Sequence, residues 1–212
     1  MKGITFGNYH SYNAFQLILA AKTIGTPSPK TETIDIPGGD GVLDLTEFFG
    51  ETKYYNRNLS FEFSTMVPKS EFMSVFSAVQ NALHGKKMVI SLDEDPDWYY
   101  TGRISVSEWK AEKNIGQLTI DCDCEPYKQS SYTTTVSKAV SSNATITLDN
   151  DKMPTVPIIT TTAEFMISFN GYNDSYSAGT FTIPELELGS GTNQVYVEGY
   201  GSISFTYRKG RL

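Results

Sequence analysis

Alternation of apolar and polar residues restricts the fold of this 212-residue chain more than any other feature of its sequence. Apolar side chains occupy every second position in residues 58–64 (NLSFEFS) and again in residues 117–124 (QLTIDCDC). Successive side chains of a β-strand point to opposite faces, so each segment would bury one face and leave the other in solvent. Residues 102–107 alternate in the same way, and so do short segments after residue 160. The sequence therefore predicts a mainly β protein.

One segment has the spacing of an amphipathic helix instead. Residues 70–85 (SEFMSVFSAVQNALHG) place apolar side chains three and four positions apart. The apolar positions are Phe72, Val75, Phe76, Val79 and Leu83. Ser70 suits the N-cap, Glu71 the positive end of the helix dipole, and Gly85 the position after the C-cap. We expect one helix of about three to four turns, packed on a sheet.

A change of composition divides the chain after Lys128. Residues 129–147 are rich in serine and threonine and nearly uncharged, which fits either a linker or a strand with threonines on its solvent face. From Pro154 onward, short alternating segments are separated by turn sequences such as Asn170-Gly171. This spacing is typical of a β-sandwich. We expect a β-rich domain with one α-helix in residues 1–128, followed by a β-sandwich domain in residues 129–212.

The acidic run DEDPD at residues 93–97 has two interpretations. Its alternate acids match the first three ligand positions of a calcium-binding loop, but the glycine and glutamate that such a loop needs at its sixth and twelfth positions are absent. The other interpretation is a hairpin in which residues 88–92 pair with residues 98–106 and the acids lie at the turn. Short acidic motifs often match by chance, so we favour the hairpin and expect no metal here.

No other group of residues predicts a reaction. Cys122 and Cys124 lie two positions apart on one face of a strand, which is poor geometry for a disulfide, and we expect them to be buried. A zinc site would need both cysteines with His10 and His84, but these histidines stand alone in the sequence. We expect His84 in the last turn of the helix instead. The sequence has no Gly-x-Ser-x-Gly motif and no phosphate-binding loop, so we expect no catalytic residue and no cofactor.

Net charge and hydropathy narrow the range of partners. The formal charge is −7, so we do not expect nucleic acid to bind through its phosphates. Polar side chains interrupt residues 1–22, and no window of the sequence has the length and hydropathy of a membrane span. We expect a soluble chain that carries no export signal.

Several short segments, in this order and spacing, resemble the distal tail protein (Dit) family of long-tailed phages (siphoviruses) and prophages of Gram-positive bacteria. They are Gly3–Phe6, Ile36–Glu47, Tyr55–Phe63, Leu83–Lys87, Asp95–Arg103 and Glu125–Lys128. Residues 191–207 resemble the second domain of that family. The resemblance covers essentially the whole chain and is stronger in residues 1–128 than in the rest.

The resemblance implies a fold and a function. In this family the N-terminal domain assembles as a six-membered ring at the end of the tail tube, and the C-terminal domain is a galectin-like β-sandwich outside the ring. The chain would then be a structural hub of a phage tail tip or baseplate, a homohexamer with a channel through which DNA passes without specific binding. Expected partners are the tail tube protein, the tail-tip or tail-associated lysin protein, and receptor-binding or baseplate proteins. The protein would be made in the cytoplasm of the host bacterium and would reside in the virion.

Two sets of structural residues are expected in such a ring-forming domain. The first set shapes the hairpin: Asp95, Pro96, Tyr99, Tyr100 and Arg103. The second set lies at a possible subunit interface: Ile4, Phe6, Tyr54 and Tyr55. A closed ring joins two different patches of each subunit, so the second set would contact a different patch of the neighbour.

Two other functions remain open from the sequence. One is a carbohydrate-binding host-surface module that acts without a ring, with tyrosines of the second domain as stacking platforms. These tyrosines are Tyr172, Tyr176, Tyr196 and Tyr200. Residues 129–212 nevertheless contain no His and no Trp, which galectin-type sugar sites use. The other function is a hydrolase that depends on Asp95 or Asp123.

Overall fold

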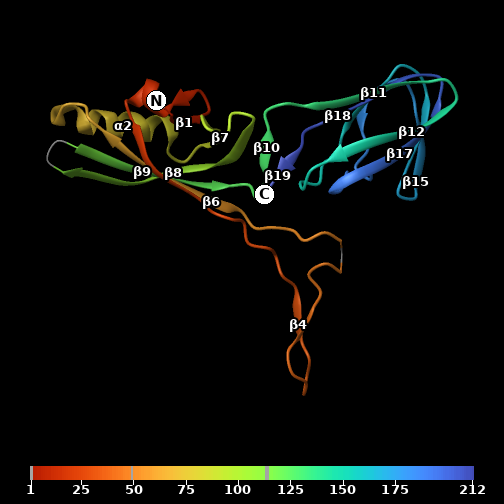
Figure 1. The fold of residues 1–212 in the computed structure, drawn as a ribbon, viewed down its shortest axis with the longest axis horizontal. Coiled ribbons are helices and arrows are strands. Elements are labelled where there is room, and N and C mark those ends of the chain that lie inside the picture. Colours follow the sequence, from red (N-terminus) through yellow and green to blue (C-terminus); the bar gives the residue numbers. More distant parts are fainter. Residues whose placement is uncertain (1, 49, 113–114) are drawn as a thin grey trace. The chain divides into compact units, whose positions relative to one another are not determined.

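The structure is a computed structural model that describes residues 2–48, 50–112 and 115–212 (Figure 1). The chain divides into two compact units, Met1–Pro126 and Tyr127–Leu212, called unit 1 and unit 2 below. Strands dominate both units, so the mainly β fold class predicted from the alternation is confirmed. Among the described residues, none of the helices combines the length and hydropathy that a membrane crossing requires.

Unit 1 is built on one antiparallel sheet with the strand order β2-β1-β7-β8-β9-β6-β3. These strands are β1 (Ile4–Phe6), β2 (Tyr9–His10), β3 (Ile18–Ile24), β6 (Arg57–Thr65), β7 (Lys87–Leu92), β8 (Trp98–Glu112) and β9 (Ile115–Cys124). The helical elements are α1 (Ser11–Phe15), the 3-10 turn η1 (Lys69–Glu71) and α2 (Phe72–Leu83). A separate hairpin of β4 (Thr33–Asp35) and β5 (Val42–Asp44) lies between β3 and β6 in the chain (Figure 1).

One face of this sheet forms the core of unit 1. Every second side chain of β6 and β9 is buried, as the alternation predicts. Phe6 of β1 packs edge-to-face on Phe61 of β6, with ring centroids 5.9 Å apart. Helix α2 adds its apolar side, including the fully buried Val79 and Leu83, to the same cluster. The opposite face of the sheet carries the polar residues of the alternating pattern.

Helix α2 begins differently from the prediction. Pro68 starts the turn η1, which the Glu71 N–H closes by donating to the Pro68 carbonyl at 2.8 Å. Ser70 therefore lies inside this turn, Glu71 is the N-cap of α2, and the prediction of Ser70 as N-cap is wrong. Gly85 follows the C-cap with φ of +77°, a left-handed conformation that glycine adopts readily, so its predicted role is confirmed.

His84 is the C-cap of α2 and joins the helix to β8. Its Nδ1 accepts a hydrogen bond from the Val106 N–H at 3.0 Å. The register of β8 against β9 shifts between Val106 and Glu108, which is the mark of a β-bulge. The sequence predicts His84 in the last turn of the helix, where a positive charge is favourable. In the structure His84 lies one position beyond the last helical residue, and its ring accepts a backbone hydrogen bond beside the bulge.

Unit 2 is a sandwich of two antiparallel sheets, with the orders β11-β18-β13-β16 and β12-β17-β14-β15. Their strands are β11 (Thr134–Val140), β12 (Asn143–Asn150), β13 (Ile158–Thr161), β14 (Phe165–Phe169), β15 (Tyr172–Tyr176), β16 (Gly179–Thr182), β17 (Gly191–Gly199) and β18 (Gly201–Tyr207). Short strands β10 (Lys128–Ser130) and β19 (Gly210–Arg211) pair with each other. The threonine-rich residues after 129 are thus strands, and the strand interpretation of that segment is confirmed.

The core of unit 2 lies between the facing sides of its two sheets. Fully buried apolar residues come from both sheets, among them Phe165 and Val197 from one and Ile159 and Phe205 from the other. The predicted turn at Asn170-Gly171 is confirmed, and it joins β14 to β15. Both of its residues have positive φ, +47° and +86°, as a two-residue hairpin turn of type I′ requires.

Candidate functional surfaces

The acidic run is the turn of a hairpin between β7 and β8. Ser91 of β7 pairs with Tyr99 of β8, and the Trp98 N–H donates to the Asp95 carbonyl at 3.2 Å across the turn. The hairpin predicted from the sequence is confirmed. In the part of the chain that the structure describes, no group of three or more His, Cys, Asp or Glu side chains lies close enough together to hold a metal ion.

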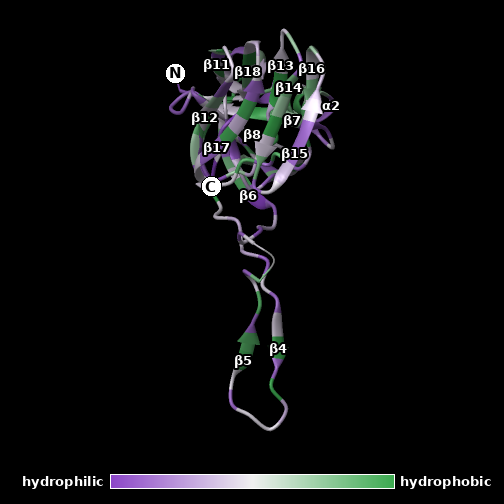
Figure 2. Ribbon diagram, turned by 90° about the vertical axis from the view of Figure 1, so that its right-hand side faces the viewer, coloured by the Kyte–Doolittle hydropathy of each residue, from purple (hydrophilic) through white to green (hydrophobic). Residues whose placement is uncertain are grey.

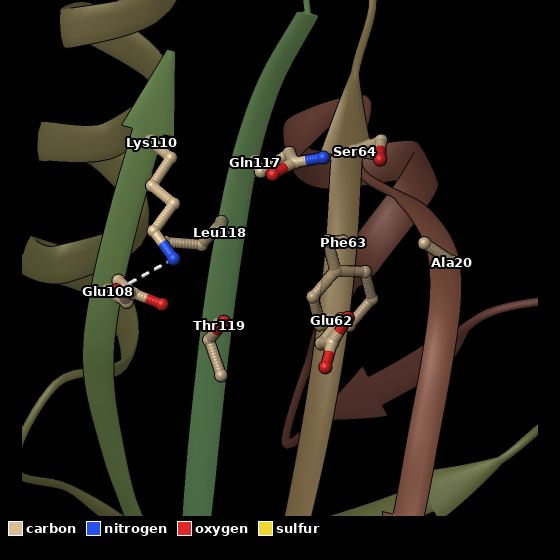
Figure 3. Close-up of a pocket in the computed structure, with 9 residues that line it drawn as sticks. All are labelled: Ala20, Glu62, Phe63, Ser64, Glu108, Lys110, Gln117, Leu118 and Thr119. Carbon is tan, nitrogen blue, oxygen red and sulfur yellow. Dashed lines mark ion pairs between the residues drawn. The ribbon is translucent and has the colours of Figure 1, made fainter. Parts of the chain in front are cut away.

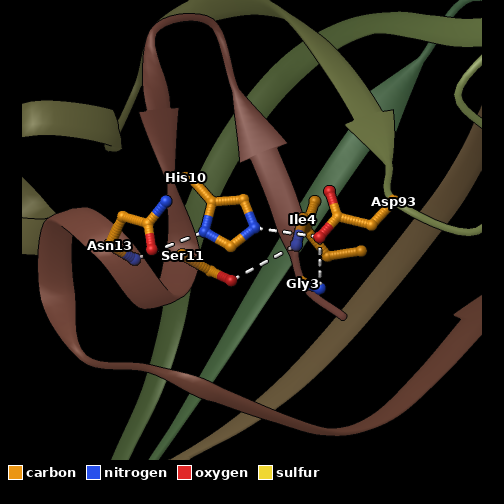
Figure 4. A network of polar contacts seen from close by, with 6 residues as sticks. All are labelled: Gly3, Ile4, His10, Ser11, Asn13 and Asp93. Atoms are coloured by element: carbon orange, nitrogen blue, oxygen red, sulfur yellow. Dashed lines mark hydrogen bonds and ion pairs between the residues drawn. The ribbon is translucent and has the colours of Figure 1, made fainter. Parts of the chain in front are cut away.

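Asp93 connects this turn to the N-terminal strand (Figure 4). Its Oδ2 accepts a hydrogen bond from the Gly3 N–H at 2.8 Å and lies 3.0 Å from Nε2 of His10. Nδ1 of His10 in turn accepts from the Asn13 N–H at 3.3 Å and so caps α1. Because Nδ1 is an acceptor in this arrangement, Nε2 carries the proton that is donated to Asp93.

Two opposing effects set the pKa of Asp93. Burial favours the neutral carboxyl and raises the pKa, while the hydrogen bonds from His10 and from the Gly3 N–H favour the carboxylate. The hydrogen bonds prevail, and the pKa of Asp93 lies below its ordinary value. The next acid, Glu94, forms an ion pair with Lys22 of β3. Asp93 therefore links the turn to the N-terminal segment, and Glu94 links it to the edge strand β3.

Tyr100 and Arg57 form a stacked pair that the sequence analysis did not anticipate. Tyr100 is buried, and the guanidinium carbon of Arg57 lies 5.4 Å from the centroid of its ring. Arg57 is itself buried, and its Nε donates to the Gly25 carbonyl at 2.9 Å. The alternation in the sequence indicates that this arginine is buried. Arg57 stands two positions before Leu59, which places both side chains on the buried face of β6.

The other predicted hairpin residues occupy different places along β8 and its turn. Arg103 is exposed, and its Nη1 donates to the Gly85 carbonyl at 2.6 Å, which ties β8 to the residue after α2. Tyr99 and Asp95 are half-buried, and Pro96 is exposed at the turn. The structure thus brings Tyr100 to Arg57 and Arg103 to Gly85, at separate points of the hairpin.

The two cysteines are fully buried on the core face of β9, as predicted. Burial raises the pKa of Cys122 far above its ordinary value and that of Cys124 to about 12, which leaves both as inert thiols at neutral pH. The backbone of β8 passes so close to Cys124 that a Cβ on Gly102 would lie 2.4 Å from its Sγ. Packing therefore accounts for both cysteines and for the glycine opposite them.

The polar face of the unit 1 sheet contains a shallow hollow (Figure 3). Glu62 of β6, Thr119 of β9 and Glu108 of β8 lie side by side across three neighbouring strands. Glu108 forms an ion pair with Lys110 at 3.0 Å. Two more acids, Asp121 and Asp123, lie further along β9 on the same face. The Ser60 hydroxyl donates to Asp121 at 2.6 Å. This face is a hydrogen-bonded polar surface on which acids and bases are mixed.

The described residues of the long segment between β3 and β6, 28–48 and 50–55, form a hairpin that we call the arm. Its ends are held together, because the Lys30 N–H donates to the Lys53 carbonyl at 2.8 Å. The strands β4 and β5 pair with Ile34 opposite Leu43. Apolar side chains of the arm are about half exposed: Ile34 52%, Ile36 47%, Val42 53% and Leu43 50%. Figure 2 shows hydrophobic residues on both arm strands.

The four residues predicted at a subunit interface fall into two groups. Ile4 and Phe6 are buried in the core of unit 1 at 1% and 0% exposure, so their side chains are not available to a neighbour. Tyr54 and Tyr55 lie at the base of the arm, where Tyr54 bridges to Pro29. Tyr55 is 58% exposed. Of the predicted set, the Tyr54–Tyr55 segment is the part that reaches the surface, and its place at a subunit interface stays a prediction.

The four tyrosines of unit 2 also separate into two groups. The hydroxyls of Tyr172 and Tyr176 are hydrogen-bonded to each other, and Tyr176 stacks on Phe181 with ring centroids 4.6 Å apart. Tyr196 and Tyr200 have no such aromatic partner hydroxyl; Tyr196 is half-buried, like Tyr172 and Tyr176, and Tyr200 is exposed. Tyr196 donates to Glu198 at 2.6 Å, a hydrogen bond that raises the pKa of this tyrosine. Tyr200 is 76% exposed.

Comparison with known proteins establishes the fold. No protein-family model and no curated protein matches the sequence. A solved structure with the same fold is that of the Dit protein (gp 19.1) of SPP1, described as a paradigm of the hub adsorption apparatus in phages that infect Gram-positive bacteria. The match covers 100% of both chains with a TM-score of 0.75 and 11% sequence identity. The chain therefore has the Dit fold, as the resemblance in its sequence predicts.

Proposed function

We propose that this chain is a structural hub of a phage tail tip, in which six copies form a ring that joins the tail tube to the tip. The observation that carries the proposal is the fold, which matches the SPP1 hub protein over the full length of both chains. The site residues add to it, because the acids and aromatics of the β7–β8 hairpin serve packing and hydrogen bonding. We assign the chain no reaction.

The arm is the part of unit 1 best suited to hold a neighbouring subunit. A two-stranded hairpin is marginally stable in water by itself, and this one exposes apolar side chains from both strands. In a ring each subunit uses two different patches, so the arm of one subunit would lie on the body of the next. The exposed Tyr55 at the base of the arm belongs to the same contact.

The polar face of the unit 1 sheet is the surface we assign to the channel. The acids Asp121, Asp123 and Glu62 lie on this face. It also carries the bases Arg103 and Lys110, but its basic side chains are not more numerous than its acidic ones. A wall of this kind repels phosphates weakly, so DNA would pass without specific binding. Unit 2 would carry the attachment points for receptor-binding or baseplate proteins, and the tail tube and the tail-tip or tail-associated lysin protein would contact the ring.

Native mass spectrometry of two matched variants tests the role of the arm. The double variant Ile34→Ser with Leu43→Ser removes the apolar pair that faces one side of the arm. The control Asp40→Asn changes a polar residue in the loop between β4 and β5. We expect the double variant to remain folded and monomeric, while the wild type and the control form hexamers. Hexamers of the double variant as stable as those of the wild type would contradict the assignment of the arm.

A further inference from the structure

The outer face of the sheet β12-β17-β14-β15 contains a hollow that the proposed function does not use. Four neighbouring strands contribute one polar side chain each to a single row across this face: Thr145, Tyr196, Ser168 and Asn173. Gln194 of β17 and the turn residue Asn170 line the same hollow. All of these side chains belong to unit 2, so the hollow is complete within one compact unit.

The chemistry of the hollow is neutral and rich in hydrogen-bonding groups. Among the described residues that line it, there is no Lys, Arg, Asp or Glu. Its groups are hydroxyls, side-chain amides and the aromatic rings of Tyr196, Tyr172 and the largely buried Phe169. Ser168 donates to Oδ1 of Asn173 at 3.0 Å, and this hydrogen bond does not use the two N–H donors of the Asn173 amide. In residues 2–48, 50–112 and 115–212, the side chain of Gln194 forms no hydrogen bond.

Tyr196 is held in the middle of this face. Its hydroxyl donates to Oε1 of Glu198, two positions further along the same strand, at 2.6 Å. The ring is half-buried between its strand neighbours, so one part of it remains accessible. A fixed aromatic ring offers flat apolar area at a low cost in conformational entropy, and the surrounding amides and hydroxyls offer donors and acceptors.

We propose that this hollow binds a neutral oligosaccharide. A sugar ring has apolar C–H faces that can lie on Tyr196, and hydroxyls that can exchange hydrogen bonds with Asn173 and Gln194. A charged ligand would find no counter-charge in the hollow. A protein partner is a poorer fit, because none of the large apolar side chains that are strongly exposed in unit 2, such as Tyr132 and Ile158, lines it. The site does not depend on the formation of a ring.

The test is saturation-transfer NMR and titration calorimetry on the full chain with a fixed panel of probes. The neutral probes are maltotriose, lactose, chitotriose and a rhamnose trisaccharide, and the charged comparators are sialyllactose and a heparin tetrasaccharide. We expect at least one neutral probe to bind at millimolar concentration, with an affinity that does not fall in high salt because no charge is involved. Lack of binding by every neutral probe, or equal binding by both charged comparators, overturns the proposal.

Matched variants locate the binding on the molecule. Tyr196→Ala should weaken the affinity about tenfold or more, as expected for a central aromatic contact. Gln194→Ala, a smaller change on an exposed residue, provides a second variant in case the first unfolds. Tyr132→Ala, at an exposed tyrosine outside this face, should leave the affinity unchanged. If Tyr196→Ala and Gln194→Ala are both folded and bind as the wild type does, the sugar does not occupy this hollow and the proposal is wrong.

Discussion

The role of the acidic turn, residues 93–97, depends on the contacts of its individual side chains. Sequence alone permitted two roles for residues 93–97, and the choice depended on partners far away in the chain. Asp93 reaches Gly3 and His10, which are 90 and 83 positions distant. Glu94 reaches Lys22. No local pattern contains these contacts: the contacts of Asp93 arise only when β1 is placed beside β7, and the contact of Glu94 depends on the position of β3. The same reason explains why the pairing of Arg57 with Tyr100 could not be predicted.

The contacts of Asp93 predict an acid-sensitive stability. The pKa of Asp93 is lowered in the folded chain by its hydrogen bonds from His10 and Gly3, which outweigh the raising effect of burial. Stability from this carboxylate is therefore present above the unfolded pKa, near 3.8, and is lost as the pH falls through the lower folded value. Thermal melts between pH 7 and pH 3 should show this loss.

The variant Asp93→Asn should lower the free energy of unfolding by about 1 kcal/mol at pH 7 and flatten this part of the pH dependence. An unchanged melting temperature and pH profile for Asp93→Asn would contradict the structural role of Asp93.

At the scale of elements, regular alternation was the reliable signal. The strands β6 and β9 follow it without a break, and both are interior strands of the sheet. The strand β3 was not predicted, because a register shift between Leu19 and Ala21 breaks its period. The helix α1 has five residues, too few to show a helical period. The strand β15 is an edge strand, and its sequence YNDSY contains mostly polar residues, so the alternation did not reveal it.

The joint between α2 and β8 makes a prediction about these two elements. His84→Ala removes the acceptor for the Val106 N–H at the bulge, which is partly buried. An N–H left without a partner costs about 1–3 kcal/mol, so the free energy of unfolding should fall by about that amount. Asn81→Ala, at an exposed position of α2, is the control and should change it little. Urea denaturation measures both. Equal stability of the two variants would mean that the His84 contact contributes nothing.

At the scale of the whole molecule, the order of the elements follows from the sequence better than the surfaces do. The composition change after Lys128 and the turns of the second half pointed to two domains, and the compact units of the structure meet between Pro126 and Tyr127. The resemblance to the Dit family predicted the fold. The interface residues were harder to predict, because the same apolar pattern describes Ile4 in a core and Ile34 on an exposed arm.

Unit 2 should fold without unit 1. It has its own core between two sheets, with buried apolar side chains from both of them. We expect residues 127–212 alone to unfold in one cooperative transition with a β-type circular dichroism spectrum. The isolated fragment should also be monomeric, because the arm belongs to unit 1. A fragment that is unfolded, or that forms rings, would contradict this division of roles.

Formation of the ring can be measured from the mass and shape of the purified full-length protein. Native mass spectrometry and cryo-electron microscopy would be carried out on one sample, over a range of protein concentrations. We expect a species of six times the subunit mass of 23.5 kDa, seen as six-fold rings with an open centre. A species that stays monomeric at every concentration, with no rings in the images, would contradict it.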